Sequence, residues 1–268
     1  AEIPRPLLAA GCTPLLAAIL HLRGLSEPGA ARSFLRGGAE TLTNPLELTG
    51  MVDAVQRLSR AVATGEHVAV YGDYDVDGIT AACLLTDYLR SRGLTCELYI
   101  PDRIREGYGL NIAAIDVLAE KGVTLIVTVD CGVTNLEETA YAAQRGVDMI
   151  VTDHHECRES LPEAEAVVDP KQPDSNGVGT ALAGVGVAFK LAYALSDCDR
   201  NVFERYCGIA AVGTVADMVP LTGENRYIAA VGIDRLHRSL SIGLNALAQV
   251  AGKDMSTVSA TDIGFAFS

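Results

Sequence analysis

The sequence lacks the long apolar segments that a membrane protein needs. No run approaches the ~20 consecutive apolar residues of a membrane-spanning helix, although 49% of the 268 residues are hydrophobic. The first residues, Ala1 to Pro6, do not show the basic and then apolar pattern of a secretory signal. Internal repeats and low-complexity segments are not visible either. We therefore expect a globular, cytoplasmic protein without a membrane partner.

The sequence also lacks paired cysteines. Its 7 cysteines include no C-x-x-C pair, and an odd, scattered set indicates reduced thiols inside the cell. Two of them adjoin acidic residues, because Cys131 follows Asp130 and Cys157 follows Glu156. Either could be a thiolate ligand of a metal. The neighbouring oxygen ligands favour harder metals, so burial as a small apolar side chain is the preferred interpretation.

Basic residues are scarce. The chain has 21 Lys and Arg against 34 Asp and Glu, which gives a formal net charge of −13 at pH 7. Proteins that bind nucleic acid usually present a basic surface, because neutralising phosphates supplies much of their affinity. This chain could bind a polyanion only through bound metals together with a local basic strip, or through a domain outside these residues.

Short apolar runs alternate with amphipathic segments through the middle of the chain. The runs predict strands at 67–71, 96–100, 124–129, 148–152 and 166–168, with helices at 79–92, 111–121 and 135–145 between them. Such a pattern is typical of an α/β fold with a mostly parallel sheet covered by helices on both faces. A helical part follows from Thr180. We expect residues 1–50 to form an N-terminal helical appendage and residues 51–268 one catalytic domain.

Four acidic segments stand directly after apolar runs. They are Gly72–Gly78 (GDYDVDG), Val127–Asp130, Val151–Glu156 (VTDHHE) and Gly213–Asp217. Ligands of parallel sheets bind beyond the carboxyl ends of the strands. Carboxylates and imidazoles gathered there without lysines are most simply neutralised by divalent cations. Two metals ~3.5–4 Å apart can activate a water and stabilise a leaving oxygen, so the sequence predicts a two-metal phosphoester hydrolase.

The first segment also resembles the beginning of a calcium-binding EF-hand loop. Such a loop needs a helix before it and a glutamate at its twelfth position. Counted from Asp73, that position is Leu84, and a strand precedes the loop. The EF-hand interpretation therefore fails. The alternating Asp73, Asp75 and Asp77 are expected to fan around a turn that Gly72 and Gly78 permit.

The remaining candidates differ in how specific they are. Asp130, taken alone, could be an ordinary helix N-cap, but beside the aspartate triplet it becomes a candidate for a carboxylate that bridges two metals. The adjacent His154 and His155 point in different directions, so one can bind metal while the other faces substrate. Asp217 follows a helix whose dipole disfavours an acid at its carboxyl end, which indicates a compensating cation. Oxygen and imidazole ligands of this kind suit Mn²⁺ or Mg²⁺.

Taken together, these segments resemble the DHH phosphoesterase superfamily. The resemblance extends from about Asn44 to the end of the chain. Within the superfamily, three stretches resemble the branch of single-stranded-DNA-specific exonucleases, and they are YGDYDVDGIT at 71–80, IPDR through EGYGL at 100–110, and LAGVGVAFKL at 182–191. One departure is Tyr71, which stands where some relatives have histidine. The superfamily also has a second phosphoesterase-associated domain, and the exonucleases add an OB-fold, neither of which we expect within these residues.

The resemblance implies a role for each candidate residue. One Mn²⁺ or Mg²⁺ ion would be held by Asp73, Asp75 and Asp130, and a second by Asp77, Asp130, His154 and Asp217. His155 would contact the scissile phosphate, and Arg103 would bind a substrate phosphate, unless Arg103 is simply a solvated loop arginine. The implied substrate is single-stranded DNA with a 5′ end, degraded to mononucleotides in repair and recombination. A single-strand-binding protein and a helicase are the implied partners.

Two other functional classes stay open at this point. A DHH hydrolase of small phosphoesters, such as a nanoRNase, a cyclic-dinucleotide phosphodiesterase or a pyrophosphatase, would suit the acidic charge, although the segment from Arg103 to Leu110 argues against it. A non-catalytic scaffold is the other class, and the complete set of candidate ligands argues against that interpretation.

Overall fold

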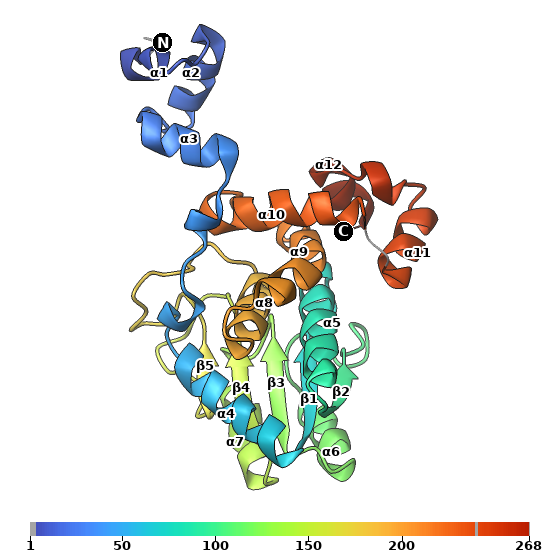
Figure 1. The fold of residues 1–268 in the computed structure, drawn as a ribbon. Coiled ribbons are helices and arrows are strands. Elements are labelled where there is room, and N and C mark those ends of the chain that lie inside the picture. Colours follow the sequence, from blue (N-terminus) through green and yellow to red (C-terminus); the bar gives the residue numbers. More distant parts are fainter. Residues whose placement is uncertain (1–3, 239–240, 268) are drawn as a thin grey trace.

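The computed structural model describes residues 4–238 and 241–267, and its centre is a five-stranded sheet (Figure 1). The strand order is β2-β1-β3-β4-β5, and all four pairings are parallel. The strands are β1 (His67–Gly72), β2 (Thr95–Tyr99), β3 (Leu125–Val129), β4 (Asp148–Thr152) and β5 (Ala166–Val168). Every residue of β3 is buried, as expected for a central parallel strand.

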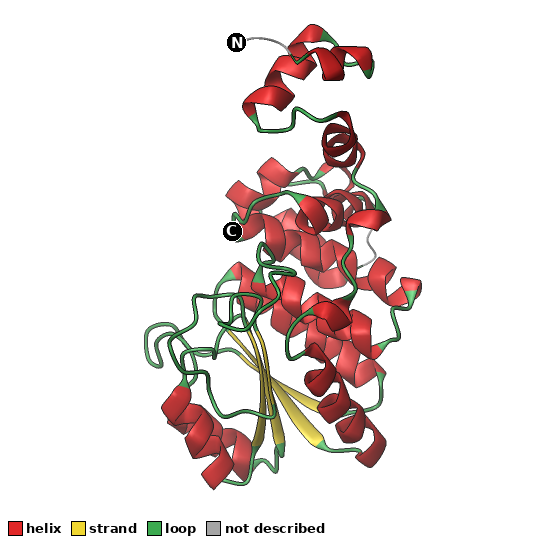
Figure 2. Cartoon of the chain, turned by 90° about the vertical axis from the view of Figure 1, so that its left-hand side faces the viewer, coloured by secondary structure: helices red, strands yellow, loops and turns green. Residues whose placement is uncertain are grey.

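Helices cover both faces of the sheet (Figure 2). One face packs on α4 (Met51–Thr64), α5 (Val76–Ser91) and α8 (Gly184–Leu195), and the other on α6 (Ile112–Glu120) and α7 (Leu136–Gln144). Alternate residues of β1 enter these two cores, with Val68 and Val70 on the first side and Ala69 and Tyr71 on the second. The predicted α/β fold with a parallel sheet between helices is confirmed.

A group of helices follows the sheet, as the sequence predicts. It comprises α8, α9 (Arg200–Ala216), α10 (Gly223–Leu236), α11 (Ile242–Val250), η3 (Met255–Thr257), α12 (Ala260–Asp262) and η4 (Ile263–Phe267). Helix α10 crosses α9 closely (Figure 1) because it has a glycine at the crossing. A Cβ atom on Gly232 would lie 2.2 Å from the Cys207 carbonyl oxygen, so only glycine fits there.

Three short helices precede the sheet and project from one end of the molecule (Figure 1). They are α1 (Arg5–Ala9), α2 (Pro14–Leu22) and α3 (Pro28–Arg36), and each has a proline in its first turn, where no backbone donor is needed. Leu7, Ala17, Leu20 and Ala31 form a small core of their own. Two short turns, η1 (Ala39–Thr41) and η2 (Pro45–Glu47), lead to α4. The division into residues 1–50 and 51–268 stays a prediction.

Among the described residues, no helix has both the length and the apolar character that crossing a membrane would require.

Candidate metal centre

The four acidic segments meet at the carboxyl edge of the sheet. Asp73 follows β1, Asp130 follows β3, His154 lies two residues after β4, and Asp217 caps the carboxyl end of α9. Three sets of side chains have donor atoms within 4.8 Å of one another: Asp73, Asp75 and Asp130; Asp77, His154 and Asp217; and Asp130, His154 and His155. The third set links the first two. All six residues that the sequence predicts as metal ligands therefore lie together.

The aspartate triplet forms a turn that begins helix α5. Asp75 is the N-cap, and its carboxylate accepts a hydrogen bond from the Gly78 backbone N–H at 2.9 Å. The helix consequently begins at Val76, three residues before its predicted start, and Asp77 lies in its first turn. In this turn Asp75 is exposed and Asp73 and Asp77 are buried, and Asp77 belongs to a different donor set from the other two.

Gly72 and Gly78 are required because they have no side chain, and not because they adopt an unusual backbone conformation. Neither residue has a positive φ, contrary to the expected reason for their presence. A Cβ on Gly78 would lie 2.6 Å from the Asp73 backbone nitrogen, and a Cβ on Gly72 would lie 2.8 Å from the Gly78 carbonyl oxygen. The two glycines therefore let the strand end and the helix start approach closely, which brings Asp73 and Asp77 to the same site.

Asp77 is held by the beginning of helix α8. Its carboxylate accepts hydrogen bonds from the backbone N–H groups of Gly184 at 2.6 Å and Val185 at 2.9 Å. Burial, together with the nearby charge of Asp130, raises the pKa of Asp77 well above its ordinary value. The first amides of α8 therefore hold the Asp77 carboxylate in position, but they and the helix dipole do not fully compensate its negative charge.

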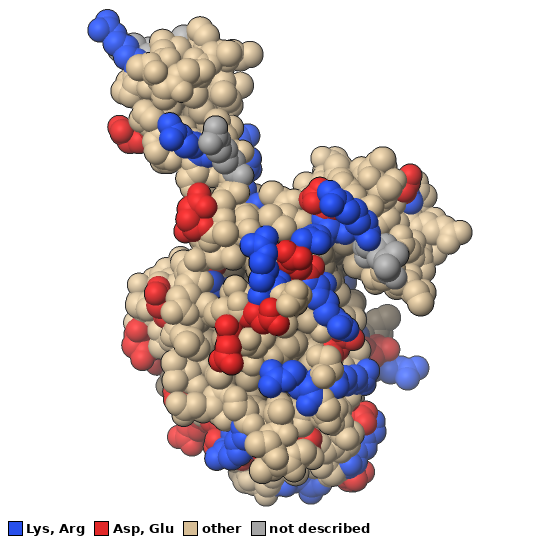
Figure 3. Space-filling model, viewed as in Figure 1, with Lys and Arg blue, Asp and Glu red and all other residues tan. Residues whose placement is uncertain are grey.

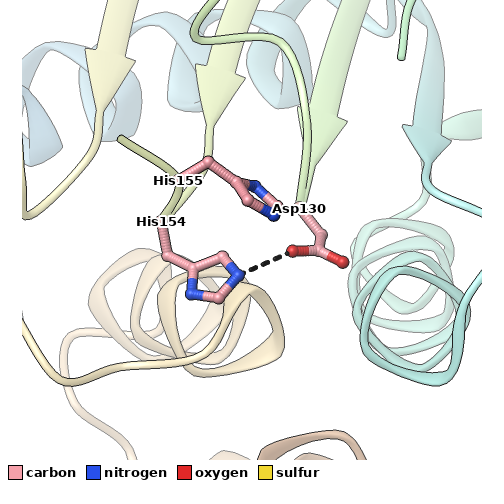
Figure 4. Close-up of side chains that lie close together, drawn as sticks. All are labelled: Asp130, His154 and His155. Atoms are coloured by element: carbon pink, nitrogen blue, oxygen red, sulfur yellow. Dashed lines mark ion pairs between the residues drawn. The ribbon is translucent and has the colours of Figure 1, made fainter. Parts of the chain in front are cut away.

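Asp130 belongs to two of the three donor sets, lies beside His154 and His155 (Figure 4), and has an unusual backbone conformation. Its φ is 62°, in the left-handed region that non-glycine residues rarely adopt, although aspartate is among the more tolerant. Its side chain is 2% exposed. Burial, followed by the charge of Asp75, raises the pKa of Asp130 to about 9. The Asp130 carboxylate is thus held in an environment, buried and close to other acids, that disfavours its ionised form.

His154 faces the carboxylates with the ring nitrogen that can bind a cation. Its Nδ1 lies 3.1 Å from the Leu182 carbonyl oxygen, and because a carbonyl only accepts, Nδ1 must carry the proton. Its Nε2 then lies 3.1 Å from Asp130 (Figure 4), 3.8 Å from Asp77 and 3.9 Å from Asp217. Metal-binding histidines commonly donate their other N–H to a carbonyl in this way.

The unsatisfied oxygens in the cluster support the same interpretation. Among the described residues, Asp73 Oδ1 and Asp130 Oδ1 are buried and take part in no hydrogen bond. Burial also raises the pKa of Asp73 and of Asp217 above the ordinary value. Buried acids without a positive partner are unfavourable, and an oxygen and imidazole donor set suits Mn²⁺ or Mg²⁺. The residues present therefore fit a pair of divalent cations.

The side-chain amide of Asn225 links the segment before α8 to the loop that follows Asp217. The buried Asn225 donates through Nδ2 to the carbonyl of Ala181, adjacent to Leu182, and to that of Pro220 at 3.2 Å. Pro220 lies three residues after Asp217. The loop of Asp217 and the carbonyl that orients His154 are therefore fixed relative to each other.

His155 belongs to the third donor set, with Asp130 and His154, and it is oriented by Asp153. Its Nδ1 lies 2.7 Å from Asp153 Oδ1, and this hydrogen bond raises the pKa of His155 to about 9. Burial alone would raise the pKa of Asp153, but hydrogen bonds from His155 and from the backbone N–H groups of Val133 and His154 hold it below its ordinary value. Asp153 is thus a positioning residue that the sequence does not identify.

We expect replacement of Asp153 by Asn to move the titration of His155. In the metal-free protein the imidazole should titrate near pH 9, and in Asp153→Asn it should shift toward ~6.5. A pKa raised by folding stabilises the protein below ~6.5, and this stabilisation disappears as pH rises through the folded value. Heteronuclear NMR of the imidazole measures the shift directly. An unchanged titration in Asp153→Asn would contradict the assigned hydrogen bond.

The loop that carries Arg103 reaches the same edge through aromatic contacts. The exposed guanidinium of Arg103 lies 5.2 Å from the centre of the Tyr74 ring. Tyr74 meets Tyr108 edge to face, and the Tyr108 hydroxyl lies 3.3 Å from His155 Nδ1. Arg103 is therefore in reach of the site while its charge stays in solvent. The two tyrosines are further site residues that the sequence pattern does not reveal.

Tyr71 and the cysteines lie outside the cluster. The Tyr71 ring stacks on Tyr99 in the layer of α6 and α7, and its hydroxyl donates to the Gly109 carbonyl at 2.9 Å. Cys131 is fully buried in the same layer. Neither it nor Cys157 belongs to any of the three donor sets found among the described residues. The position of Cys131 agrees with the interpretation of a small apolar side chain.

The chain is similar to known proteins over most of its length. The model of the DHH family N-terminal domain matches residues 67–214. Single-stranded-DNA-specific exonuclease RecJ of Bacillus subtilis is 41% identical over 253 residues, which is 94% of this chain and 32% of that protein. The same exonuclease of Escherichia coli is 34% identical, covering 97% of this chain and 47% of its own length. The chain thus spans 32% of the first and 47% of the second of these curated relatives.

Solved structures are similar as well. RecJ of Thermus thermophilus in complex with Mn²⁺ superposes with a TM-score of 0.80 at 31% identity, covering 98% of this chain and 37% of that one. Exonuclease RecJ bound to manganese gives a TM-score of 0.74 at 35% identity, covering 85% of this chain and 56% of that one.

Proposed function

Since the chain belongs to the DHH family, we propose that it is the catalytic part of a metal-dependent single-stranded-DNA exonuclease. It would release mononucleotides from the 5′ end of a strand during repair and recombination. The observation that carries this proposal is the group of six candidate ligands, all but Asp75 buried or half-buried, linked through Asp130 and His154 at the carboxyl edge of the sheet. Similarity to the manganese-bound exonucleases supports the substrate class.

We propose that Asp73, Asp75 and Asp130 hold one Mn²⁺ or Mg²⁺ ion, and that Asp77, Asp130, His154 and Asp217 hold a second. When bound, the ions would supply an activated water and stabilise the leaving oxygen. Helix α8 keeps Asp77 in place through its first amides, and the Leu182 carbonyl keeps His154 Nε2 turned toward the acids. These contacts prepare the site before a substrate arrives.

His155 and Arg103 are proposed to act on the phosphate. The hydrogen bond to Asp153 raises the pKa of His155 and so favours the protonated imidazole, which can donate a charged hydrogen bond to a phosphoryl oxygen. Asp153 fixes the ring through Nδ1, which leaves Nε2 for the substrate. The exposed Arg103 can turn from the Tyr74 ring to a phosphate of the strand, to which its planar fork is suited.

Three wider assignments are proposals of the same kind. Residues 1–50 would form an appendage to a catalytic domain at 51–268, the protein would act in the cytoplasm, and a single-strand-binding protein and a helicase would be its partners. Co-purification of the full-length protein with those partners would test the last of them.

End-labelled substrates test the proposed activity. With Mn²⁺ at low salt, we expect the chain to release labelled mononucleotide from a 5′-labelled single strand before any label is released from a 3′-labelled one. The net charge of −13 favours the alternative, a hydrolase of small phosphoesters. Faster turnover of a dinucleotide or of pyrophosphate than of the strand would establish that alternative, and release from the 3′ end alone would refute the proposed direction.

A further inference from the structure

A groove lies between the N-terminal helices and the beginning of α10. It encloses about 640 Å³, and its walls include Arg23, Phe34, Pro220, Thr222 and Arg226. Pro220 follows Asp217 by three residues, so their Cα atoms are at most ~11 Å apart. This space, called here the α3–α10 groove, therefore begins close to the candidate metal centre.

The arginines of the α3–α10 groove have no acidic partners. The Arg226 guanidinium lies 3.9 Å from the centre of the Phe34 ring and donates to the Phe34 carbonyl, while Arg23 lies 6.0 Å from the same ring. Within residues 4–238 and 241–267, neither forms an ion pair, and no acidic residue lines the groove. The neighbouring Glu224 is paired with Lys190 at 2.7 Å. Both arginine charges therefore remain available to a ligand.

A second, larger groove shows the opposite arrangement. It encloses about 730 Å³ between α5, α9 and α10, and three arginines line it. Each is paired with a carboxylate: Arg205 with Asp87 at 2.9 Å, Arg235 with Glu204 at 2.7 Å, and Arg238 with Asp234 at 3.4 Å. The arginine charges of this larger groove are thus paired, whereas those of the α3–α10 groove are not.

The N-terminal helices themselves depart from the charge of the chain. Residues 4–38 contain four arginines and one glutamate, whereas the whole chain has a net charge of −13. Figure 3 shows more basic than acidic side chains on this part of the molecule. A local basic strip of this kind is what a polyanion would require of so acidic a protein.

We propose that the α3–α10 groove binds the sugar–phosphate backbone of the DNA strand whose end reaches the metal centre. This assignment rests on the proposed function. Arginine forks match phosphate oxygens, and single-strand sites commonly combine basic grooves with aromatic rings such as Phe34. The groove would hold the strand behind the scissile phosphate and so favour longer substrates over dinucleotides. It also gives the N-terminal appendage a function that its sequence does not reveal.

Charge reversal at Arg23 tests the proposal. Arg23 is exposed and can be replaced by Glu without disturbing a core. The matched control is Arg238→Glu, which changes another exposed arginine, in the larger groove. Binding of a hydrolysis-resistant phosphorothioate strand of about 12 nucleotides would be measured by fluorescence anisotropy with Mn²⁺ at several salt concentrations. We expect Arg23→Glu to weaken binding roughly 10-fold and to reduce the salt slope by about one, while Arg238→Glu leaves both unchanged.

Turnover of a dinucleotide separates this proposal from the proposed function. It should be equal in the unaltered chain and in Arg23→Glu, because so short a substrate does not reach the groove. If strand binding depends on Arg23, the proposal that the α3–α10 groove binds DNA is supported, even if the unaltered chain does not hydrolyse strands. Equal affinity and salt slope in Arg23→Glu, or no strand binding by the unaltered chain, would overturn it. Tighter binding of poly-glutamate than of DNA would instead assign the groove to an acidic protein segment.

Discussion

Replacement of Asp130 by Asn should reduce metal-dependent hydrolysis by roughly 10³-fold or more, because this residue is shared by the proposed ligand sets of both cations. Asn is the informative substitute, since it tolerates the left-handed backbone at this position (φ 62°) better than Ala. Rates on a 5′-labelled strand, measured across Mn²⁺ concentrations, would show whether added metal restores activity. The control is Asp116→Asn, a change of the same kind on the outer helix α6.

The same substitution should stabilise the metal-free protein. The pKa of Asp130 is raised to about 9 by folding, so the unfolded chain ionises this acid more easily. A raised carboxyl pKa makes folding less favourable as pH rises above ~3.9. Removing the acid should therefore increase the free energy of unfolding at neutral pH by an amount on the order of 1 kcal/mol. Thermal unfolding in a chelator would test this, and a less stable variant would contradict the inferred electrostatics.

Replacement of Gly184 by Ala should impair the site without changing any ligand. A Cβ at this position would lie 2.4 Å from Asp130 Oδ1, so the beginning of α8 and Asp130 would have to move apart. Overpacking of this kind costs about 1–3 kcal/mol of stability, and a displacement of ~1 Å at a reacting centre can reduce the rate 10²-fold. Strand hydrolysis and Mn²⁺ affinity would be compared with those of the unaltered chain.

Gly243→Ala is the matched control for Gly184→Ala. Gly243 lies in α11, a Cβ added to it would meet no atom within 4 Å, and its φ is not positive. Alanine in an unhindered helix should be stabilising by roughly 0.5–1 kcal/mol and should leave activity unchanged. Native activity in Gly184→Ala would show that Asp130 does not need its close contact with α8.

The sheet could be predicted because a buried parallel strand has a simple sequence pattern. The run from Leu125 to Val129 is apolar or β-branched throughout, and all of it is buried. Two helix starts were harder to predict because side-chain contacts determine them, and in α5 the N-cap Asp75 places the start at Val76. The apolar run suggests that α8 begins near Ala181, but the helix begins at Gly184, since distant side chains bind the carbonyls of Ala181 and Leu182.

The acids of the site could be predicted because parallel strands end at one edge, which brings Asp73 and Asp130 together. Residues whose role is to position another side chain have no comparable sequence pattern. Asp153 adjoins the histidines in sequence, yet only the structure shows that it orients His155. The unpaired arginines of the α3–α10 groove were also invisible, because pairing depends on neighbours far along the chain.

Calorimetric titration of Mn²⁺ into the metal-free chain tests the two-cation site most directly. The arrangement of the six candidate ligands predicts two bound ions per chain, with neither bound at comparable affinity in Asp130→Asn, whose side chain is shared by both ligand sets. Asp116→Asn should bind two ions as the unaltered chain does. No binding by the unaltered chain, or two ions bound equally well by Asp130→Asn, would contradict the assignment of this cluster as a metal centre.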